Sequence, residues 1–291
     1  MTIIVGVGPR HQSSGALELA AALSKARDES LLVVTVVPPR WSLPSMARVD
    51  AEFAAWAAQQ AELRLTDAAT VLNQLGATEV SYQRVDHRSQ AGALLALAQD
   101  TSASLIVVGS SEDGRRGHIE FGSTSDGLVH SAELPVGVAP RGYAGPGARF
   151  TRVTCAVTGD PSEEATIKAA AEMAAHMKAS FRLVTFAVRL DTMYPPEVGL
   201  NAEDEVVAAA RDQARQAFEE MQASGILPAD AEATVGVGRG WRASIESVPW
   251  QESELLVLGS KPRGALSRVF LGSAATKIVR HSPVPVILLP A

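Results

Sequence analysis

The sequence predicts an α/β protein of two tandem doubly wound domains, each an open five-stranded parallel sheet with helices on both faces. The first observation is an internal repeat, because Gly109 aligns with Gly259 and Gly122 with Gly272, at one constant offset. The second is that short apolar runs alternate with amphipathic segments in both halves of the chain. Apolar strands separated by helices are typical of parallel sheets.

Length and the repeat together predict the domain organisation. The chain has 291 residues, of which 46% are hydrophobic and 20% charged, enough for two domains that each bury a core. We assign residues 1–141 to the first domain and 151–291 to the second. Residues 142–150 lie in a glycine-rich stretch and form the expected linker.

In the first unit, apolar runs of strand length alternate with segments of helical spacing. The longest helical segment is expected to stop at Gly76, because glycine readily adopts the left-handed conformation that ends helices. The expected strands are residues 2–8, 30–37, 79–85, 104–109 and 135–140. The expected helices are residues 13–26, 47–76, 89–100 and 123–132.

The second unit repeats this pattern element by element. The expected strands are residues 152–157, 181–188, 233–238, 254–259 and 283–290. The expected helices are residues 163–179, 201–225, 242–251 and 273–282. In sheets of this kind, ligands bind beyond the carboxyl ends of the strands, where the strand order reverses. The loops after the first and fourth strands should meet there.

The loop after the fourth strand has the composition of a phosphate-binding loop in both units. Its glycines allow backbone N–H groups to approach phosphate oxygens, and the helix that follows begins with unpaired N–H groups. Lys261, Arg263 and Arg268 would add cationic contacts in the second unit. The candidate nucleotide-binding residues are Gly259, Ser260, Lys261, Arg263, Gly264, Gly272, Ser273 and Ala274, with Gly109, Ser110, Gly122, Ser123 and Thr124 in the first unit.

Both loops resemble the hallmark of the universal stress protein family. That hallmark is Gly, two residues, Gly, nine residues, Gly, then Ser or Thr, followed by a helix and a Pro-Val-rich strand. Gly259, Gly272 and Ser273 match it, as do Gly109 and the Gly122-Ser123 pair, so the resemblance covers nearly the whole chain. It implies the strand order 3-2-1-4-5 in each unit, ATP at this loop in many members, and pairing of the two units through their last strands.

The chain also departs from the family pattern. Glu112 and Pro262 replace the middle glycine of the hallmark; glutamate repels phosphate, and proline has no N–H to donate. ATP-binding members usually carry an aspartate at the end of the first strand, where this chain has Gly8 and Thr158. Asp160 is a candidate substitute in the second unit.

ATP is expected in the second unit more than in the first. The second unit keeps Gly264 and several basic residues in its loop. In the first unit the basic residues share the loop with acids that disfavour phosphate. The charged and titratable residues of that loop are Glu112, Asp113, Arg115, Arg116, His118 and Glu120.

Composition and missing motifs argue against several other functions. The net charge of −6 disfavours a nucleic-acid surface, and no apolar run approaches the roughly 20 residues that span a membrane. The start of the chain does not resemble a signal peptide. Cys155 is the single cysteine, and we interpret it as a small core residue. The absence of a signal-peptide pattern and of a second cysteine suggests the cytoplasm. His11 stands where a dinucleotide fingerprint needs a third glycine, and no nucleophile elbow or metal-ligand spacing occurs.

Two functional classes therefore remain open, and we expect neither to be an enzyme, although slow ATP hydrolysis is left open. The first is a cytoplasmic stress-response regulator that binds ATP or a related nucleotide. The second is a nucleotide-free interaction module whose two units form a pseudo-dimer with degenerate sites. Either class allows a homodimer and a protein partner that the sequence does not identify. Trp41 and Tyr194 are candidate contact residues for such a partner. Phe53 and Trp56, by contrast, are expected in the core. An adenylate-forming enzyme is the least favoured alternative.

Overall fold

The described part of the first half of the chain contains five strands and four helices. The computed structural model describes residues 1–8, 14–39, 47–158, 161–189, 202–263, 268–270 and 272–290. The elements of the first half are β1 (Thr2–Val7), α1 (Gly15–Arg27), β2 (Ser30–Val37), α2 (Ala47–Gln74), β3 (Val80–Asp86), α3 (Gln90–Asp100), β4 (Leu105–Gly109), α4 (Ser123–Val129) and β5 (Val136–Ala139).

The second half repeats these elements and adds a hairpin. Its elements are β6 (Arg152–Ala156), a 3-10 turn (Pro161–Glu163), α5 (Glu164–Met177), β7 (Ser180–Arg189), α6 (Ala202–Ala223), β8 (Glu232–Arg239), α7 (Gly240–Glu246), β9 (Glu254–Gly259), β10 (Lys261–Arg263), β11 (Arg268–Phe270), α8 (Ser273–His281) and β12 (Val286–Leu289). The prediction of a helix over 242–251 is wrong after Glu246, since Pro249 cannot donate the N–H that a helix needs.

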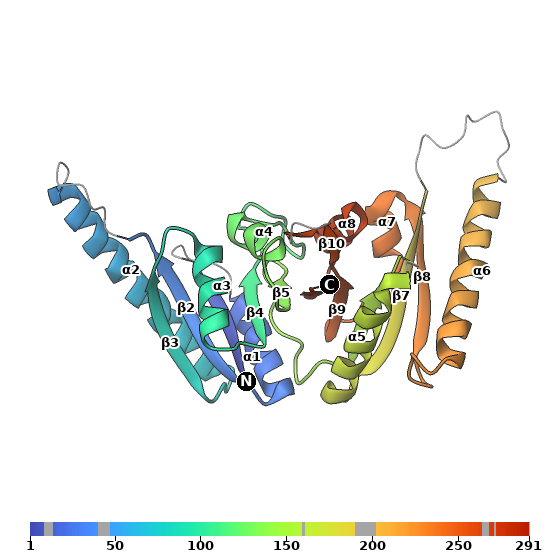
Figure 1. The fold of residues 1–291 in the computed structure, drawn as a ribbon, viewed down its shortest axis with the longest axis horizontal. Helices are drawn as coiled ribbons and strands as arrows, with labels where there is room; N and C mark the ends of the chain where they lie inside the picture. Colours follow the sequence, from blue (N-terminus) through green and yellow to red (C-terminus); the bar gives the residue numbers. More distant parts are fainter. Residues whose placement is uncertain are drawn as a thin grey trace.

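The strand order in each half is 3-2-1-4-5, which confirms the prediction. The order β3-β2-β1-β4-β5 continues into β12-β9-β6-β7-β8, so the two halves form one ten-stranded sheet (Figure 1). Within this ten-stranded sheet, all neighbouring strands are parallel except β5 and β12, which pair antiparallel with Gly137 opposite Ile287. The expected pairing of the two units through their last strands is therefore present within one chain.

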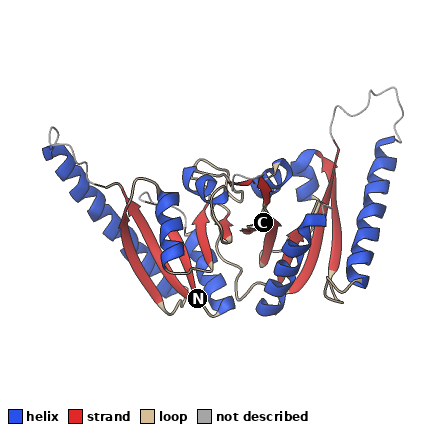
Figure 2. Cartoon of the chain, viewed as in Figure 1, coloured by secondary structure: helices blue, strands red, loops and turns tan. Residues whose placement is uncertain are grey.

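Helices cover both faces of this sheet, as Figure 2 shows, and two apolar cores result. One core joins residues of α1, α2, α5 and α6 to one face, and the other joins residues of α3, α4, α7 and α8 to the opposite face. Each core contains residues from both halves of the chain. Cys155 lies fully buried in the first core, as predicted, and burial raises the pKa of its thiol, with the charge of Glu163 adding to the effect.

The repeat extends to details of the backbone. Asp28 caps the C-terminus of helix α1, and Lys178 caps that of helix α5. Both residues adopt a left-handed conformation, with φ of 53° and 51°. A non-glycine residue rarely adopts this conformation, except where a helix end requires it. The two halves thus share local geometry as well as topology.

Helix α2 presents a different face to the sheet from the one that the sequence suggested. Phe53 and Trp56 were expected in the core, but they are 51% and 56% exposed, and their rings contact each other at 5.9 Å. The buried stripe instead contains Ala57, Ala61 and Leu65. Small residues at this spacing allow the helix to approach β2 closely, which leaves the two aromatic rings on the outer side.

The second half buries a charged network that the first half lacks. Arg182 on β7 is 1% exposed and Glu254 on β9 is 0% exposed, and a guanidinium nitrogen of Arg182 donates to Glu254 Oε1 at 2.5 Å. Thr154 on β6 also donates to this oxygen and accepts from Arg182 Nε at 3.0 Å. Since Ile4, Leu32 and Ser104 occupy the aligned positions of the first half, the network belongs to one copy only.

Candidate functional site

The candidate site of each half lies where its strand order reverses, at the carboxyl ends of β1 and β4 and of β6 and β9. The loop between β4 and α4 holds the predicted residues of the first half. Its counterpart between β9 and α8 holds those of the second half. The two loops can therefore be compared position by position.

The loop of the first half is closed by hydrogen bonds between its own ends. The Ser111 N–H donates to the Glu120 carbonyl at 2.8 Å, and the Glu120 N–H donates to Ser110 Oγ at 2.8 Å. The Ser110 N–H donates to the carbonyl of Ala139 on β5 at 2.9 Å. Ser110 and its neighbours therefore use their polar groups to hold the loop rather than to present donors outward.

The middle of the same loop is tied to the turn that follows β5. The guanidinium of Arg141 donates to the carbonyl of Gly114 at 2.5 Å. The N–H of Gly117 donates to the carbonyl of Arg141 at 2.8 Å, and the N–H of Arg141 donates to the carbonyl of His118 at 3.0 Å. Arg116 lies against Gly142 of that turn. This loop is consequently a folded excursion with fixed partners.

Two polar groups at the start of α4 also have partners within the first half. The N–H of Gly122 donates to Ser125 Oγ at 2.9 Å, and the hydroxyl of Thr124 donates to Gln90 Oε1 on α3 at 2.6 Å. The crevice beside Gly109 has a volume of about 50 Å³, with Leu94 of α3 projecting into it. Small-molecule sites occupy roughly 300–1,000 Å³, so the crevice between the described residues is much smaller than a typical ligand site.

In the second half, the first predicted residues serve the sheet. The N–H and the hydroxyl of Ser260 both donate to the carbonyl of Leu289 on β12, at 2.9 and 3.0 Å. A Cβ atom at Gly259 would lie 2.4 Å from Thr166 Oγ1 of α5, so the glycine permits the close approach of that helix. Gly259 and Ser260 therefore fix where the loop leaves the sheet.

The loop that follows is a short antiparallel hairpin and not the open loop that the sequence suggested. Strand β10 pairs with β11, with Lys261 opposite Phe270, Pro262 opposite Val269, and Arg263 opposite Arg268. For Lys261 and Arg263, the structure describes the backbone pairing. The predicted residue Gly264 lies outside the described residues.

Helices α4 and α8 begin with similar exposure but with different neighbours. Ser123 at the start of α4 and Ser273 at the start of α8 are both exposed, and Thr124 and Ala274 are both half-buried. No described atom lies within 4 Å of the position that a Cβ at Gly272 would take, whereas at Gly122 the side chain of Ser111 is 3.6 Å away. Among the described residues, the side of Gly272 that a Cβ would occupy consequently faces open space.

The neighbouring side chains also differ between the halves. Lys277 of α8 lies over the ring of Trp241 on α7, with its ammonium 5.7 Å from the ring centre, and Trp241 contacts Phe186 of β7 at 6.3 Å. The first half has Gly127 and Ala91 in the places of Lys277 and Trp241. A cation and an aromatic ring therefore border the second site but not the first.

A carboxylate that the sequence reasoning missed stands at the end of β6. Glu163, at the start of α5, accepts from the Thr158 N–H at 2.9 Å and from the Thr158 hydroxyl at 2.8 Å. Thr158 occupies the position where the resemblance led us to look for an aspartate. The proposed substitute, Asp160, lies outside the described residues. The signal for Glu163 was an acid at the expected start of a helix, where the helix dipole favours it.

Charged groups of the two halves approach each other next to these loops. Burial lowers the pKa of His281 on α8, and the charges of His118 and Arg242 lower it further. A hydrogen bond from Arg242 lowers the pKa of Glu246 on α7. His118 belongs to the loop of the first half, so its electrostatic effect on α8 reaches across the pairing of β5 with β12.

The fold and the paired loops define a tandem of two doubly wound α/β domains. A sequence model described as the universal stress protein family matches residues 1–140 and 149–290. A universal stress protein of Mycobacterium tuberculosis (strain ATCC 25618 / H37Rv) is 40% identical over 291 residues, covering 100% of both chains. The chain belongs to the universal stress protein family.

More distant relatives span the same length. A universal stress protein of Mycolicibacterium smegmatis is 25% identical over 296 residues, covering 99% of this chain and 96% of the relative. A crystal structure of a universal stress protein from Archaeoglobus fulgidus superposes with a TM-score of 0.63 at 18% identity, covering 99% of this chain and 98% of that one. This likeness supports the two-domain fold. Within the described part of the chain, no helix combines the length and apolarity that crossing a membrane requires.

Proposed function

We propose that this protein is a cytoplasmic stress-response regulator that binds one ATP, or a related nucleotide, in its second half. The proposal rests on membership of the family and on the difference between the two loops. The observation that carries it is the open space beside Gly272, since at the aligned Gly122 the side chain of Ser111 is 3.6 Å from the position of a Cβ.

The start of α8 supplies the chemistry that a phosphate needs. Its first N–H groups lack intrahelical acceptors and carry the positive end of the helix dipole, and Ser273 adds a hydroxyl. Lys277 places a cation on the same helix, one turn beyond Ser273. In the first half, by contrast, the N–H of Gly122 already has a partner.

Calorimetric titration with Mg-ATP tests this proposal, using a matched pair of variants. We expect a stoichiometry of one for the full chain, loss of binding in Ser273→Glu, and unchanged binding in Ser123→Glu. A carboxylate at either serine faces the N–H groups of its own helix, so the pair reports which helix binds. Loss of binding in Ser123→Glu alone, or no heat with the unmodified chain, would contradict the proposal.

We further propose that the nucleotide acts as a switch and not as a substrate. Binding shifts the equilibrium between loop conformations, and a partner protein reads that shift. Release of phosphate from ATP is the direct measurement. Turnover at rates typical of enzymes, about 1 s⁻¹ or faster, would overturn this part of the proposal.

The pairing of β5 with β12 favours a second candidate, a nucleotide-free interaction module. One chain already joins two units in the manner of a symmetric dimer, which needs no ligand. If neither ATP nor AMP produces heat or a thermal shift, this candidate replaces the first. The oligomeric state of the purified chain, measured by analytical ultracentrifugation, then shows whether a homodimer forms as well.

A further inference from the structure

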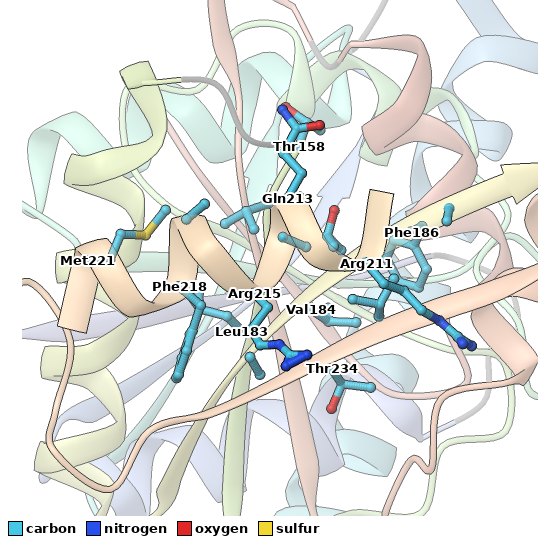
Figure 3. A pocket seen from close by; sticks show the side chains of 17 residues that line it. Thr158, Leu183, Val184, Phe186, Arg211, Gln213, Arg215, Phe218, Met221 and Thr234 are labelled. Atoms are coloured by element: carbon cyan, nitrogen blue, oxygen red, sulfur yellow. The ribbon is translucent and has the colours of Figure 1, made fainter. Parts of the chain in front are cut away.

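A cavity of about 720 Å³ lies between α6 and the sheet of the second half, away from the loop between β9 and α8. Its walls come from α6 on one side and from β7 and β8 on the other, with Val157 and Thr158 at the end of β6 (Figure 3). The volume falls within the roughly 300–1,000 Å³ of small-molecule sites. None of the candidate nucleotide-binding residues lines it.

The same place in the first half is filled. There, Ala61 and Leu65 of α2 are buried against β2. The aligned residues of α6 are Arg211 and Arg215, and both line the cavity. Long charged side chains replace small apolar ones on this helix, and the space that the first half fills stays open in the second.

The two arginines lie at the solvent-exposed border of the α6 face that lines the cavity, and Arg215 also lies 3.9 Å from Asp212. Arg211 and Arg215 are one turn apart, and Phe218 follows at helical spacing, so the three side chains share one face. Figure 3 shows Arg211 and Arg215 extending from α6 on the side of the strands. This face therefore changes from cationic to apolar along the helix.

The opposite wall and the far end of the cavity are mainly apolar. Leu183 of β7 is buried, and Phe218 and Met221 of α6 are partly buried against the same core. Thr158 and Thr185 add hydroxyl groups. A cavity with an apolar interior and two guanidinium groups at one end suits a ligand with an apolar body and a single anionic head.

We propose that this cavity binds a small amphipathic acid, with its carboxylate at Arg211 and Arg215 and its hydrocarbon body between α6 and β7. Arginine suits this role because its planar fork pairs with both carboxylate oxygens. The apolar body gains free energy by leaving water, at about 25 cal/mol for each Å² buried. The cavity reaches the end of β6 at Thr158, but no residue of the loop between β9 and α8 lines it.

Decanoate is the probe, and isothermal titration calorimetry of the full chain is the measurement. We expect saturable binding of decanoate and none of decyltrimethylammonium, which has the same hydrocarbon body and the opposite charge. The variant Arg211→Gln/Arg215→Gln removes the charge and keeps the shape. We expect it to weaken decanoate binding by about a hundredfold or more, since two charge-assisted hydrogen bonds of roughly 1.5–3 kcal/mol each are lost.

Two further variants separate charge from volume. Arg64→Gln on α2 removes an arginine next to the filled position Leu65 and should leave decanoate binding unchanged. Ala217→Trp fills the cavity and should abolish binding, with circular dichroism as the check on folding. The proposal is overturned if decanoate gives no saturable heat, if the double glutamine variant binds as well as the unmodified chain, or if Mg-ATP displaces decanoate.

Discussion

Replacing Glu254 with alanine should destabilise the protein by about 3–5 kcal/mol, because it leaves a buried arginine without its counter-charge. Glu254 accepts hydrogen bonds from Thr154 and Arg182 through one oxygen and from the N–H of Gln251, at 3.0 Å, through the other. All three donors lose their acceptor in the variant. Burial also lowers the pKa of Arg182, which the charge of Glu254 counteracts in the native protein.

Urea denaturation followed by tryptophan fluorescence measures this effect. Trp250 reports on the site itself, since the guanidinium carbon of Arg182 lies 5.2 Å from the centre of its ring. The matched control is Glu232→Ala, which removes an exposed carboxylate 3.9 Å from Arg152 and should change stability by less than about 1 kcal/mol.

A triple variant tests the physical reasoning more sharply. Thr154→Ile/Arg182→Leu/Glu254→Ser gives the second half the residues that the first half has at these positions. Replacing both partners of a buried ion pair with uncharged residues leaves no unpaired charge at Arg182, so we expect the triple variant to lose less stability than Glu254→Ala. A loss below about 1 kcal/mol for Glu254→Ala, or a triple variant as unstable as the single one, would refute the reasoning.

Three other predictions concern single positions. Gly259→Ala should lower the free energy of unfolding, measured by urea denaturation, by about 1–3 kcal/mol, because the new Cβ would lie 2.4 Å from Thr166 Oγ1. Adding Thr166→Ala should restore the lost stability. Gly109→Ala should be nearly neutral, because the nearest atom to its new Cβ is 3.8 Å away. An unrescued double variant would contradict this account. Burial holds the pKa of His281 in the folded protein below its ordinary value of about 6.5. The neutral imidazole therefore contributes its full stabilisation above about pH 6.5, and this stabilisation is lost as the pH falls through the lowered pKa of the folded state. His281→Asn should therefore reduce the drop in Tm between about pH 7.5 and about pH 5.5, and an unchanged drop would argue against the assignment. Cys155 should react with a thiol reagent at about pH 8 only after unfolding, because burial raises the pKa of its thiol; rapid labelling of the native protein would exclude the buried position.

The fold followed from the sequence because its determinants are local and occur twice. Apolar runs, helical spacing and glycine positions repeat in both halves, so each half supports the interpretation of the other. Long-range packing decided the remainder. The exposure of Trp56 depends on which stripe of α2 meets β2, and an apolar stripe with Ala57 at one edge fits two orientations.

The candidate site was predictable in position but not in its state. The glycine spacing located both loops, yet nothing near Gly114 in the sequence indicates that Arg141 will bind its carbonyl. That contact exists because β5 returns beside β4 and brings the following turn against the loop. Likewise, Ser125 takes the N–H of Gly122 only after α4 has formed. Whether a loop has free donors is thus decided by tertiary partners.

Joining the two units in one chain explains why they differ where a homodimer could not. In a homodimer each substitution appears in both subunits, so a change that closes one site closes both. Here the pairing of β5 with β12 is held within one chain, and each unit carries its own residues. The first unit satisfies its loop with its own side chains, while the second places charges in its core and opens space under α6. Each of these features occurs once within the described residues, so one unit of the chain can change without altering the other and without losing the symmetric frame that holds them together.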